Sequence, residues 1–271
     1  MLVIRANNFN RSRGIRFNVD LTGFNVVITG GSNGLGFEMS KALLSHGATV
    51  AIAARRGERL EKAYETFKHE GYDVHKLEMD VRNVDSVDVA ASWVMDNWER
   101  LDMLINNAGL SMSGVGSAQS VTPVPFFEIH PKAFYDVIET NLIGYFLVAR
   151  AFVPIMIRNG RGRIVNVSTG EGIMTARGML PYGPSRAGSD AMSIIMPKEM
   201  EDFNITVNLL SPGGPADTGF VTKENREHYE GIGLLPASCM NEAILFLASD
   251  KAAGINGEKI TATQLSQWLN V

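Results

Sequence analysis

One stretch of this chain has the residue types and spacing to bind a phosphate group: Thr29-Gly30-Gly31-Ser32-Asn33-Gly34-Leu35-Gly36. It follows an apolar run at 26–28 that is typical of a buried strand, and it precedes apolar residues at helical spacing in 37–44. Glycine lets the backbone approach a ligand closely, and a helix start offers free N–H groups to an anion. The alternative is a plain glycine-rich loop. We predict a dinucleotide-binding turn, made by Gly30, Ser32, Asn33, Gly34, Leu35 and Gly36.

The charges that follow the next apolar run indicate which dinucleotide binds. About twenty residues after such a turn, an NAD-binding fold usually carries an acid for the ribose 2′-hydroxyl. This chain has Ala54 there, followed by Arg55 and Arg56. A guanidinium binds a 2′-phosphate through paired hydrogen bonds, whereas a carboxylate repels it, so we expect NADP(H) in preference to NAD(H). In the alternative, both arginines are solvated charges that pair with Glu58 or Glu61.

Apolar, strand-like runs alternate with helical stretches along the whole chain. The helical stretches are long enough for right-handed crossovers, and several runs lack the alternation of a half-exposed strand. We predict an α/β fold with a single-domain, Rossmann-type doubly wound parallel sheet of about seven strands and helices on both faces. This domain is expected at 21–271, after an N-terminal extension at 1–20. The expected strands are Asn25–Thr29, Ala48–Ala53, Asp73–Glu78, Met103–Asn106, Arg163–Val167, Ile205–Leu210 and Lys259–Thr263.

The composition limits the classes of function. The 271 residues are 45% hydrophobic, which suits one large core, and the net charge of −4 leaves no broad basic face for nucleic acid. No apolar run is judged long enough to span a bilayer, and the five histidines lack metal-ligand spacing, so neither a membrane nor a metal site is expected. The single cysteine, Cys239, fits a reducing compartment, so we expect a cytoplasmic protein. The arginine-rich start is interpreted as a surface or inter-subunit extension, with a transit peptide as the alternative.

Several motifs, taken in order, resemble those of the short-chain dehydrogenase/reductase family. The glycine turn resembles the family's Thr-Gly-x-x-x-Gly-x-Gly, and Asn106-Asn107-Ala108-Gly109 resembles its Asn-Asn-Ala-Gly. The resemblance runs from about residue 21 to residue 257 and implies an oxidoreductase that acts on CH–OH or C=O groups with NAD(P)(H). It implies further cofactor contacts for Asp80 and Val81 at the adenine ring, for Asn107, Ala108 and Gly109, for Pro212 and Gly213 over the nicotinamide, and for Thr218 at its carboxamide.

The active centre departs from the family pattern in two places. The family has a serine thirteen residues before its tyrosine, and this position, counted from Tyr182, is Thr169. Its hydroxyl can still donate and accept a hydrogen bond, so we expect Thr169 to orient the substrate carbonyl, with Ser168 as the alternative. Both hydroxyls could instead make only local backbone bonds at the end of a strand. The helix asparagine of the family matches Asn141.

The second departure is that Tyr-x-x-x-Lys becomes Tyr182-Gly183-Pro184-Ser185-Arg186. Residues four apart share a helix face, so Arg186 lies near Tyr182 and favours its phenolate. In the family the lysine also holds the ribose and passes protons along a water chain that the asparagine, here Asn141, helps to organise. Arginine stays protonated and cannot readily do the latter. The resemblance therefore implies an NADP(H)-dependent oxidoreductase that interconverts a ketone or aldehyde and an alcohol by hydride transfer, with Tyr182 as general acid/base and activity reduced by Arg186. The alternative is a catalytically impaired cofactor-binding structural or regulatory subunit.

The resemblance also indicates how the chain assembles. The helix expected from Ala133 to about Arg158 and the helix that carries Tyr182 form a subunit contact in the family, so a homodimer or homotetramer is implied. The partner at the site would be a small carbonyl or alcohol substrate. Phe126 and Phe127 belong either to an apolar pocket wall or to the core. Trp268 is expected to pack against a neighbouring subunit or to cover the pocket.

Overall fold

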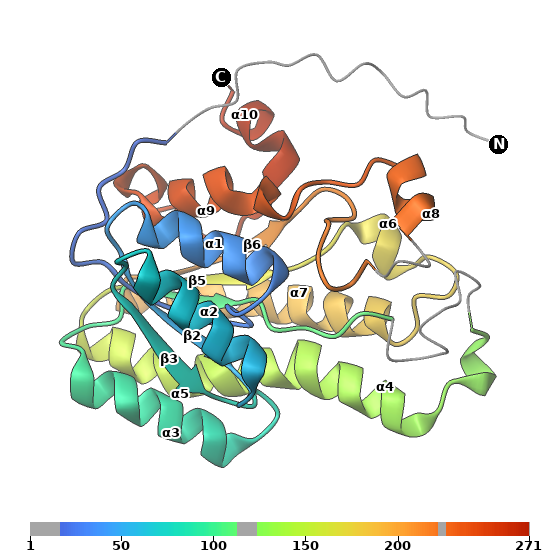
Figure 1. The fold of residues 1–271 in the computed structure, drawn as a ribbon, viewed down its shortest axis with the longest axis horizontal. Coiled ribbons are helices and arrows are strands. Elements are labelled where there is room, and N and C mark those ends of the chain that lie inside the picture. Colours follow the sequence, from blue (N-terminus) through green and yellow to red (C-terminus); the bar gives the residue numbers. More distant parts are fainter. Residues whose placement is uncertain (1–16, 113–123, 222–225, 271) are drawn as a thin grey trace.

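Seven strands form one parallel sheet in the computed structural model, which describes residues 17–112, 124–221 and 226–270 (Figure 1). The strands are β1 (Asn25–Thr29), β2 (Thr49–Ala54), β3 (Val74–Glu78), β4 (Met103–Asn106), β5 (Gly162–Val167), β6 (Ile205–Ser211) and β7 (Lys259–Thr261). Their order across the sheet is β3-β2-β1-β4-β5-β6-β7. The predicted fold class is confirmed, and the predicted strand ends differ from those of the structure by at most two residues.

The order in which strands are added reverses at β1. This strand pairs with β2 on one side and with β4 on the other, so that Val27 lies between Ala51 and Leu104. Such a reversal leaves a crevice at the carboxyl ends of the strands, where an open α/β sheet binds its ligands. The residues that end β1, β4, β5 and β6 at this edge are Thr29, Asn106, Val167 and Ser211.

Helices cover both faces of the sheet (Figure 1). The longer ones are α1 (Gly34–Leu44), α2 (Glu58–His69), α3 (Val84–Asn97), α4 (Pro131–Ile138), α5 (Gly144–Arg158), α7 (Tyr182–Glu199) and α9 (Asn241–Ala248). Val26 and Ile28 of β1 belong to one core cluster with α1, α2 and α9, whereas Val27 belongs to another with α3 and α5. Successive side chains of a strand point to opposite faces, so β1 is buried on both sides. The shorter helices are η2 (Phe126–Glu128), α6 (Glu171–Met174), η4 (Glu201–Phe203), α8 (Arg226–Gly231), η5 (Ala237–Met240), η6 (Asp250–Ala252), η7 (Ala262–Gln264) and α10 (Leu265–Trp268).

The long helix expected from Ala133 is interrupted in the structure. It begins at Pro131, and a π-helical segment, η3 (Glu139–Ile143), separates α4 from α5. Within the described residues, the stretch 131–158 is the one helix whose length and composition would allow it to cross a bilayer. The expectation that no stretch is long enough was wrong by this measure. Half of its most apolar window is buried in the molecule, where α5 packs against α3 and the sheet.

The two ends of the described chain pack on α9. Phe17 is buried, its N–H donates to Glu242 over 2.9 Å, and its ring lies 5.4 Å from that of Phe246. The ring of Trp268 lies 6.0 Å from the same phenylalanine. Trp268 therefore packs against the core of its own chain, where it is partly buried, and its expected contact with a neighbouring subunit or over the pocket stays a prediction. Most of the predicted extension, residues 1–16, lies outside the described residues.

Candidate active site

The glycine turn brings the start of α1 close to the end of β1. Gly30 and Gly34 have φ of 66° and 55°, values that favour glycine. A Cβ on Gly36 would lie 2.2 Å from the Gly30 carbonyl oxygen, so only glycine allows this approach. The Asn33 side chain accepts from the Gly34 N–H over 2.9 Å and begins the helix. The turn exposes backbone N–H groups at a helix start, as an anion site requires.

Thr29 and Asn107 hold this turn against the loop that follows β4. The Thr29 hydroxyl accepts from the N–H groups of Asn107 and Ala108 over 2.9 and 3.0 Å. The Asn107 side chain donates to the Thr29 carbonyl over 3.0 Å and to that of Gly30 over 3.3 Å. Two of the predicted cofactor residues, Asn107 and Ala108, thus act as a scaffold for the turn itself.

A groove with a volume of about 500 Å³ joins the turn to the loop after β6. Ser32, Asn33, Gly34 and Thr218 all line it, so the structure brings these four predicted cofactor residues together. Leu35 instead packs on the hydrophobic core. The groove is also lined by two cations of α2 that the sequence analysis missed, Arg59 and Lys62.

The two arginines after β2 have different surroundings. Arg56 lies 3.7 Å from Glu78, whereas Glu61 pairs with Lys76 at 2.6 Å. The partners expected in the alternative interpretation, Glu58 and Glu61, were therefore wrong. Arg55 makes no ion pair with any residue that the structure describes.

Asp80 follows β3 and is held by a neighbouring cation. Arg82 donates to both of its carboxylate oxygens, from Nε over 3.1 Å and from Nη2 over 2.9 Å. These hydrogen bonds hold the pKa of the Asp80 carboxyl below its ordinary value, and the charge of Arg55 contributes in the same direction. Val81 is buried and packs beside Gly144 at the start of α5.

Tyr182 and Arg186 share one face of the first turns of α7. The guanidinium of Arg186 lies 5.4 Å from the centre of the Tyr182 ring and 5.5 Å from that of Tyr145, a residue of α5. Its Nη1 donates to the Tyr145 hydroxyl over 2.8 Å and to the Val167 carbonyl over 2.9 Å. The Tyr145 hydroxyl donates in turn to the Val167 carbonyl over 3.0 Å. Arg186 is 3% exposed, so this positive charge is fixed inside the protein.

Gly109 makes room for this buried guanidinium. A Cβ at Gly109 would lie 2.5 Å from Arg186 Nη2. Burial opposes the charge of Arg186, but interactions with the Tyr145 and Tyr182 side chains outweigh it and raise the pKa of the guanidinium above its ordinary value. Arg186 Nε is buried and has no hydrogen-bond partner among the described residues.

The two hydroxyls that follow β5 are not equivalent. Ser168 Oγ donates a short hydrogen bond to Asp190 of α7, and Lys259 of β7 donates to the other oxygen of that carboxylate over 2.7 Å. The Thr169 hydroxyl makes no hydrogen bond to a described residue. Neither side chain makes the local backbone bond of the purely structural interpretation, and Thr169 alone keeps its hydroxyl available.

Asn141 lies in the π-helical segment and links three parts of the site. Its Oδ1 accepts from the Leu110 N–H over 2.8 Å, and its Nδ2 donates to the Leu110 carbonyl over 2.9 Å and to Ser185 Oγ over 3.0 Å. It thereby ties the loop after β4 to the first turn of α7. The π segment gives the helix the extra residue with which this contact is made.

The Pro212-Gly213 turn lies against the last strand. Gly213 has φ of 93°, and a Cβ there would lie 2.0 Å from the Thr263 hydroxyl. The loops after β4 and β6 were expected to shape the pocket, but residues 113–123 and 222–225 of them lie outside the described residues. Phe126 and Phe127 are 72% and 73% exposed, which excludes both from the core of this chain.

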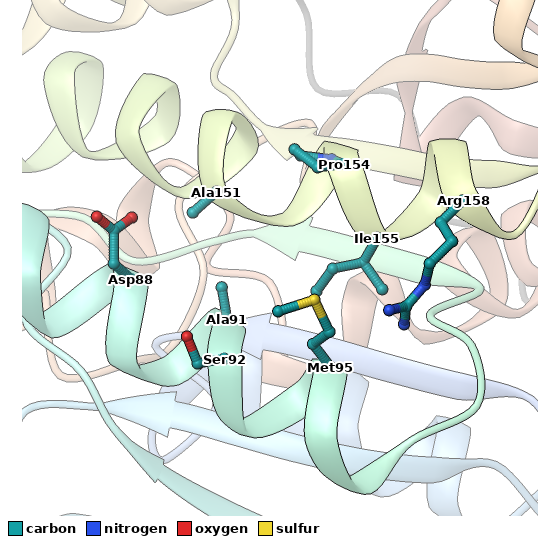
Figure 2. Close-up of a pocket in the computed structure, with 8 residues that line it drawn as sticks. All are labelled: Asp88, Ala91, Ser92, Met95, Ala151, Pro154, Ile155 and Arg158. Carbon is teal, nitrogen blue, oxygen red and sulfur yellow. The ribbon is translucent and has the colours of Figure 1, made fainter.

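A second hollow lies on the outer surface, between α3 and α5 (Figure 2). It has a volume of about 240 Å³, and Asp88 and Arg158 are its charged lining residues. The predicted site residues are absent from its lining. It is therefore separate from the candidate active site.

Sequence reasoning missed three side chains that organise the site: Tyr145, Asp190 and Lys259. Helical spacing could have indicated the first two. Tyr145 is four residues after Asn141, and Asp190 is four after Arg186, so each was a candidate for the same helix face. The approach of Lys259 depends on pairing between β6 and β7, which no local pattern specifies.

Comparisons with known proteins agree with this geometry. The family model for short chain dehydrogenases matches residues 25–229. The chain belongs to the short chain dehydrogenase family. Membership of this family places the protein among oxidoreductases that use NAD(P)(H). It also accounts for the Rossmann-like sheet.

Relatives of the chain within this short chain dehydrogenase family match it over most of its length. It is 29% identical to the 3-oxoacyl-[acyl-carrier-protein] reductase FabG of Aquifex aeolicus (strain VF5) over 250 residues, which cover 89% of this chain and 96% of that protein. It is 30% identical to nodulation protein G of Rhizobium sp. (strain N33) over 249 residues, which cover 89% and 96%. A short-chain type dehydrogenase/reductase from Mycobacterium marinum has the same fold, with a TM-score of 0.78 at 24% identity over 89% of this chain and 94% of that one.

Proposed function

We propose that this protein is an NADP(H)-dependent oxidoreductase that interconverts a ketone or aldehyde and an alcohol, with Tyr182 as general acid/base. The observation that carries the proposal is the buried guanidinium of Arg186, 5.4 Å from the centre of the Tyr182 ring and bonded to the end of β5. A fixed positive charge at this place stabilises a tyrosine oxygen that has given up its proton. The relative in Aquifex aeolicus is named as a reductase of a 3-oxoacyl group, which is a reaction of the same class.

The residues around the glycine turn fit such a dinucleotide. Gly36 approaches Gly30 closely and no side chain covers the backbone between them. The start of α1 therefore provides N–H groups for a pyrophosphate. Arg55 is exposed and without an ion pair in the described part of the chain, so it is available to a 2′-phosphate. The unpartnered Nε of Arg186 is a buried donor that can donate a hydrogen bond to a ribose hydroxyl.

Each side chain near the carboxyl end of β5 has its own role in the proposed reaction. When bound, NADPH would supply the hydride. Thr169 donates its free hydroxyl to the substrate carbonyl oxygen and orients it, and Tyr182 donates its proton to the same oxygen. Arg186 stabilises the resulting phenolate, and Asn141 keeps the first turn of α7 in place through Ser185. In the direction of alcohol oxidation, the Tyr182 oxygen accepts the proton.

A panel of ketones and aldehydes, followed by NADPH oxidation, tests the proposed reaction. We expect turnover by the wild type and a loss of about 100-fold or more in Tyr182→Phe, which is the usual contribution of a general acid. NADPH binding by this variant should remain within about threefold, since only one hydroxyl is removed. Turnover that survives Tyr182→Phe would show that another group donates the proton.

The same panel separates the second candidate function, a catalytically impaired subunit. The observation in its favour is that Arg186 stays protonated and so cannot relay a proton as lysine does. A wild type that binds NADPH and is silent, together with an active Arg186→Lys variant, would support this reading. Turnover by the wild type that falls in Arg186→Lys would support the enzyme.

The cofactor preference is tested separately by reversing one charge. Arg55→Asp should weaken NADPH binding by about 10- to 100-fold and leave NADH binding within about threefold, because only NADPH carries the 2′-phosphate. Arg158→Asp, at the hollow between α3 and α5 in Figure 2, is the matched control and should change neither. Equal weakening of both cofactors would contradict this role of Arg55.

The assembly that we propose is a homodimer or homotetramer formed through α5 and α7. Phe146 of α5 is 50% exposed, and Ile194 and Ile195 of α7 are each 52% exposed, which is costly unless a partner covers them. Light scattering should give a molar mass that is a multiple of the 29.6 kDa of one chain. This mass should fall in Ile194→Glu and stay unchanged in Val89→Glu of α3. We also propose that the protein resides in the cytoplasm and binds neither nucleic acid nor membranes. Cell fractionation tests this, and the protein should appear in the cytoplasmic fraction and not with the membranes.

A further inference from the structure

Tyr145 is the only tyrosine within the described residues that ranks among the largest fully buried side chains, and its position is unusual for its chemistry. Its hydroxyl accepts from Arg186 Nη1 over 2.8 Å and donates to the Val167 carbonyl over 3.0 Å. Its ring also faces the guanidinium, at 5.5 Å from ring centre to Cζ. Burial raises the pKa of the Tyr145 phenol above its ordinary value, so the hydroxyl is protonated and can do both tasks at once.

These contacts fix where the charge of Arg186 lies. The guanidinium is planar and larger than an ammonium. It fits in the interior only if its two terminal nitrogens, Nη1 and Nη2, both have room and Nη1 has hydrogen-bond partners. Nη1 is held by Tyr145 and Val167, and Nη2 occupies the space that Gly109 leaves. The Tyr182 ring also lies close, with its centre 5.4 Å from the guanidinium carbon. The cation therefore has two tyrosine rings from different helices as near neighbours.

We propose that Tyr145 is a positioning residue that makes arginine workable at position 186, by holding the guanidinium against Tyr182. This inference rests on the proposed function, in which Tyr182 is the general acid/base. It assigns a task to a fully buried side chain that takes no part in the proposed proton transfer itself. A lysine at position 186 would lack the second nitrogen that fills the space beside Gly109, so its charge would be positioned differently.

The inference is tested by following tyrosine ionisation, which requires no turnover. Absorbance at 295 nm is titrated for the wild type and for Tyr182→Phe, and the difference reports Tyr182. The titration is then repeated in the Tyr145→Phe background, which removes one oxygen atom. We expect the pH midpoint of the Tyr182 signal to rise by about one unit, because the charge of Arg186 is no longer held against the phenolate. Tyr135→Phe is the matched control, since this tyrosine is 63% exposed on α4, and it should leave the midpoint unchanged.

A second comparison distinguishes positioning from general loosening of the fold. In an Arg186→Lys background, Tyr145→Phe should shift the midpoint by less than about 0.3 units, because no guanidinium remains to be positioned. If Tyr145→Phe fails to fold, Gly109→Ala displaces Nη2 instead and should raise the midpoint in the same direction. An unchanged midpoint, or an equal shift with Arg186 and with Lys at position 186, would overturn the inference. Absence of turnover with these shifts present would overturn the proposed function alone.

Discussion

Gly36→Ala tests the glycine turn more directly than any charge reversal. The added Cβ would lie 2.2 Å from the Gly30 carbonyl oxygen and 2.5 Å from Asn107 Nδ2. The first of these atoms belongs to the backbone, so the side chains cannot relieve the clash by rotating. The end of β1 and the start of α1 must move apart, by roughly 1 Å, before the methyl group fits.

The size of the effect follows from what this movement disturbs. Inserting one methyl group into a packed site costs about 1–3 kcal/mol of folding free energy, which is roughly 2–10 °C in Tm for a chain of this length. The same displacement draws turn N–H groups away from a bound pyrophosphate. Each hydrogen bond to a charged group is worth about 1.5–3 kcal/mol, so the loss of one or two weakens binding by roughly 100-fold.

NADPH fluorescence titration and thermal unfolding measure the two effects on one sample. Gly231→Ala is the control, because a Cβ at Gly231 meets nothing within 4 Å and its φ is not positive. That variant should keep the Kd for NADPH within a factor of about two and keep Tm within about 1 °C. If folded Gly36→Ala binds NADPH within threefold of the wild type, the turn is not the phosphate site and the reasoning from its close approach fails.

Three other features give measurable outcomes. Asp190→Asn leaves Lys259 only its longer contact with Glu171, at 3.8 Å, and should lower the free energy of unfolding by about 1–3 kcal/mol, seen as a lower Tm; an unchanged Tm would show that the pair contributes nothing. Burial raises the pKa of the Cys239 thiol to about 11, so about one thiol in a thousand is ionised at pH 8. A thiol reagent should therefore react at least about tenfold more slowly with the native protein than with the unfolded chain, and equal rates would contradict the burial. Arg82 lowers the pKa of Asp80, which stabilises the fold above the ordinary pKa of that carboxyl, and this stability is lost as the pH falls through the lowered value. Arg82→Gln should remove about 0.5–1 kcal/mol at pH 7 and move acid unfolding to higher pH, whereas acid unfolding at an unchanged pH would argue against the pair.

The sheet could be predicted from the sequence because its strands are buried on both faces. Runs such as 26–28 and 103–105 are apolar and buried at every position, and each is followed by the polar residue that ends its strand, Thr29 or Asn106. The interruption of the helix at Glu139–Ile143 could not be predicted. No local pattern marks the π segment, and Asn141 within it bonds to Leu110, which is distant in the sequence.

The sequence predicted the parts of the candidate site whose residues come from a single helix or a single turn. The glycine turn is local, and Tyr182 and Arg186 share one helix, so spacing alone places them. The sequence favoured Thr169 as the residue that orients the substrate carbonyl, with Ser168 as the alternative, but no local pattern decides this choice. It depends on Asp190 and Lys259, which come from α7 and β7, and the structure distinguishes the two hydroxyls through those partners.

The burial of Arg186 bears on whether this site works. Moving an ion from water into a protein interior costs several kcal/mol unless partners compensate, and an arginine with no task is more stable with its charge in solvent. Here the guanidinium is 3% exposed and is held by a hydroxyl, a carbonyl and two aromatic rings, while its Nε still lacks a partner among the described residues. A structural ion pair would satisfy all of its donors. A buried donor left open is available to a ligand such as a ribose hydroxyl, so Arg186 supports cofactor binding in either candidate function, and turnover by the wild type and by Arg186→Lys decides between the two.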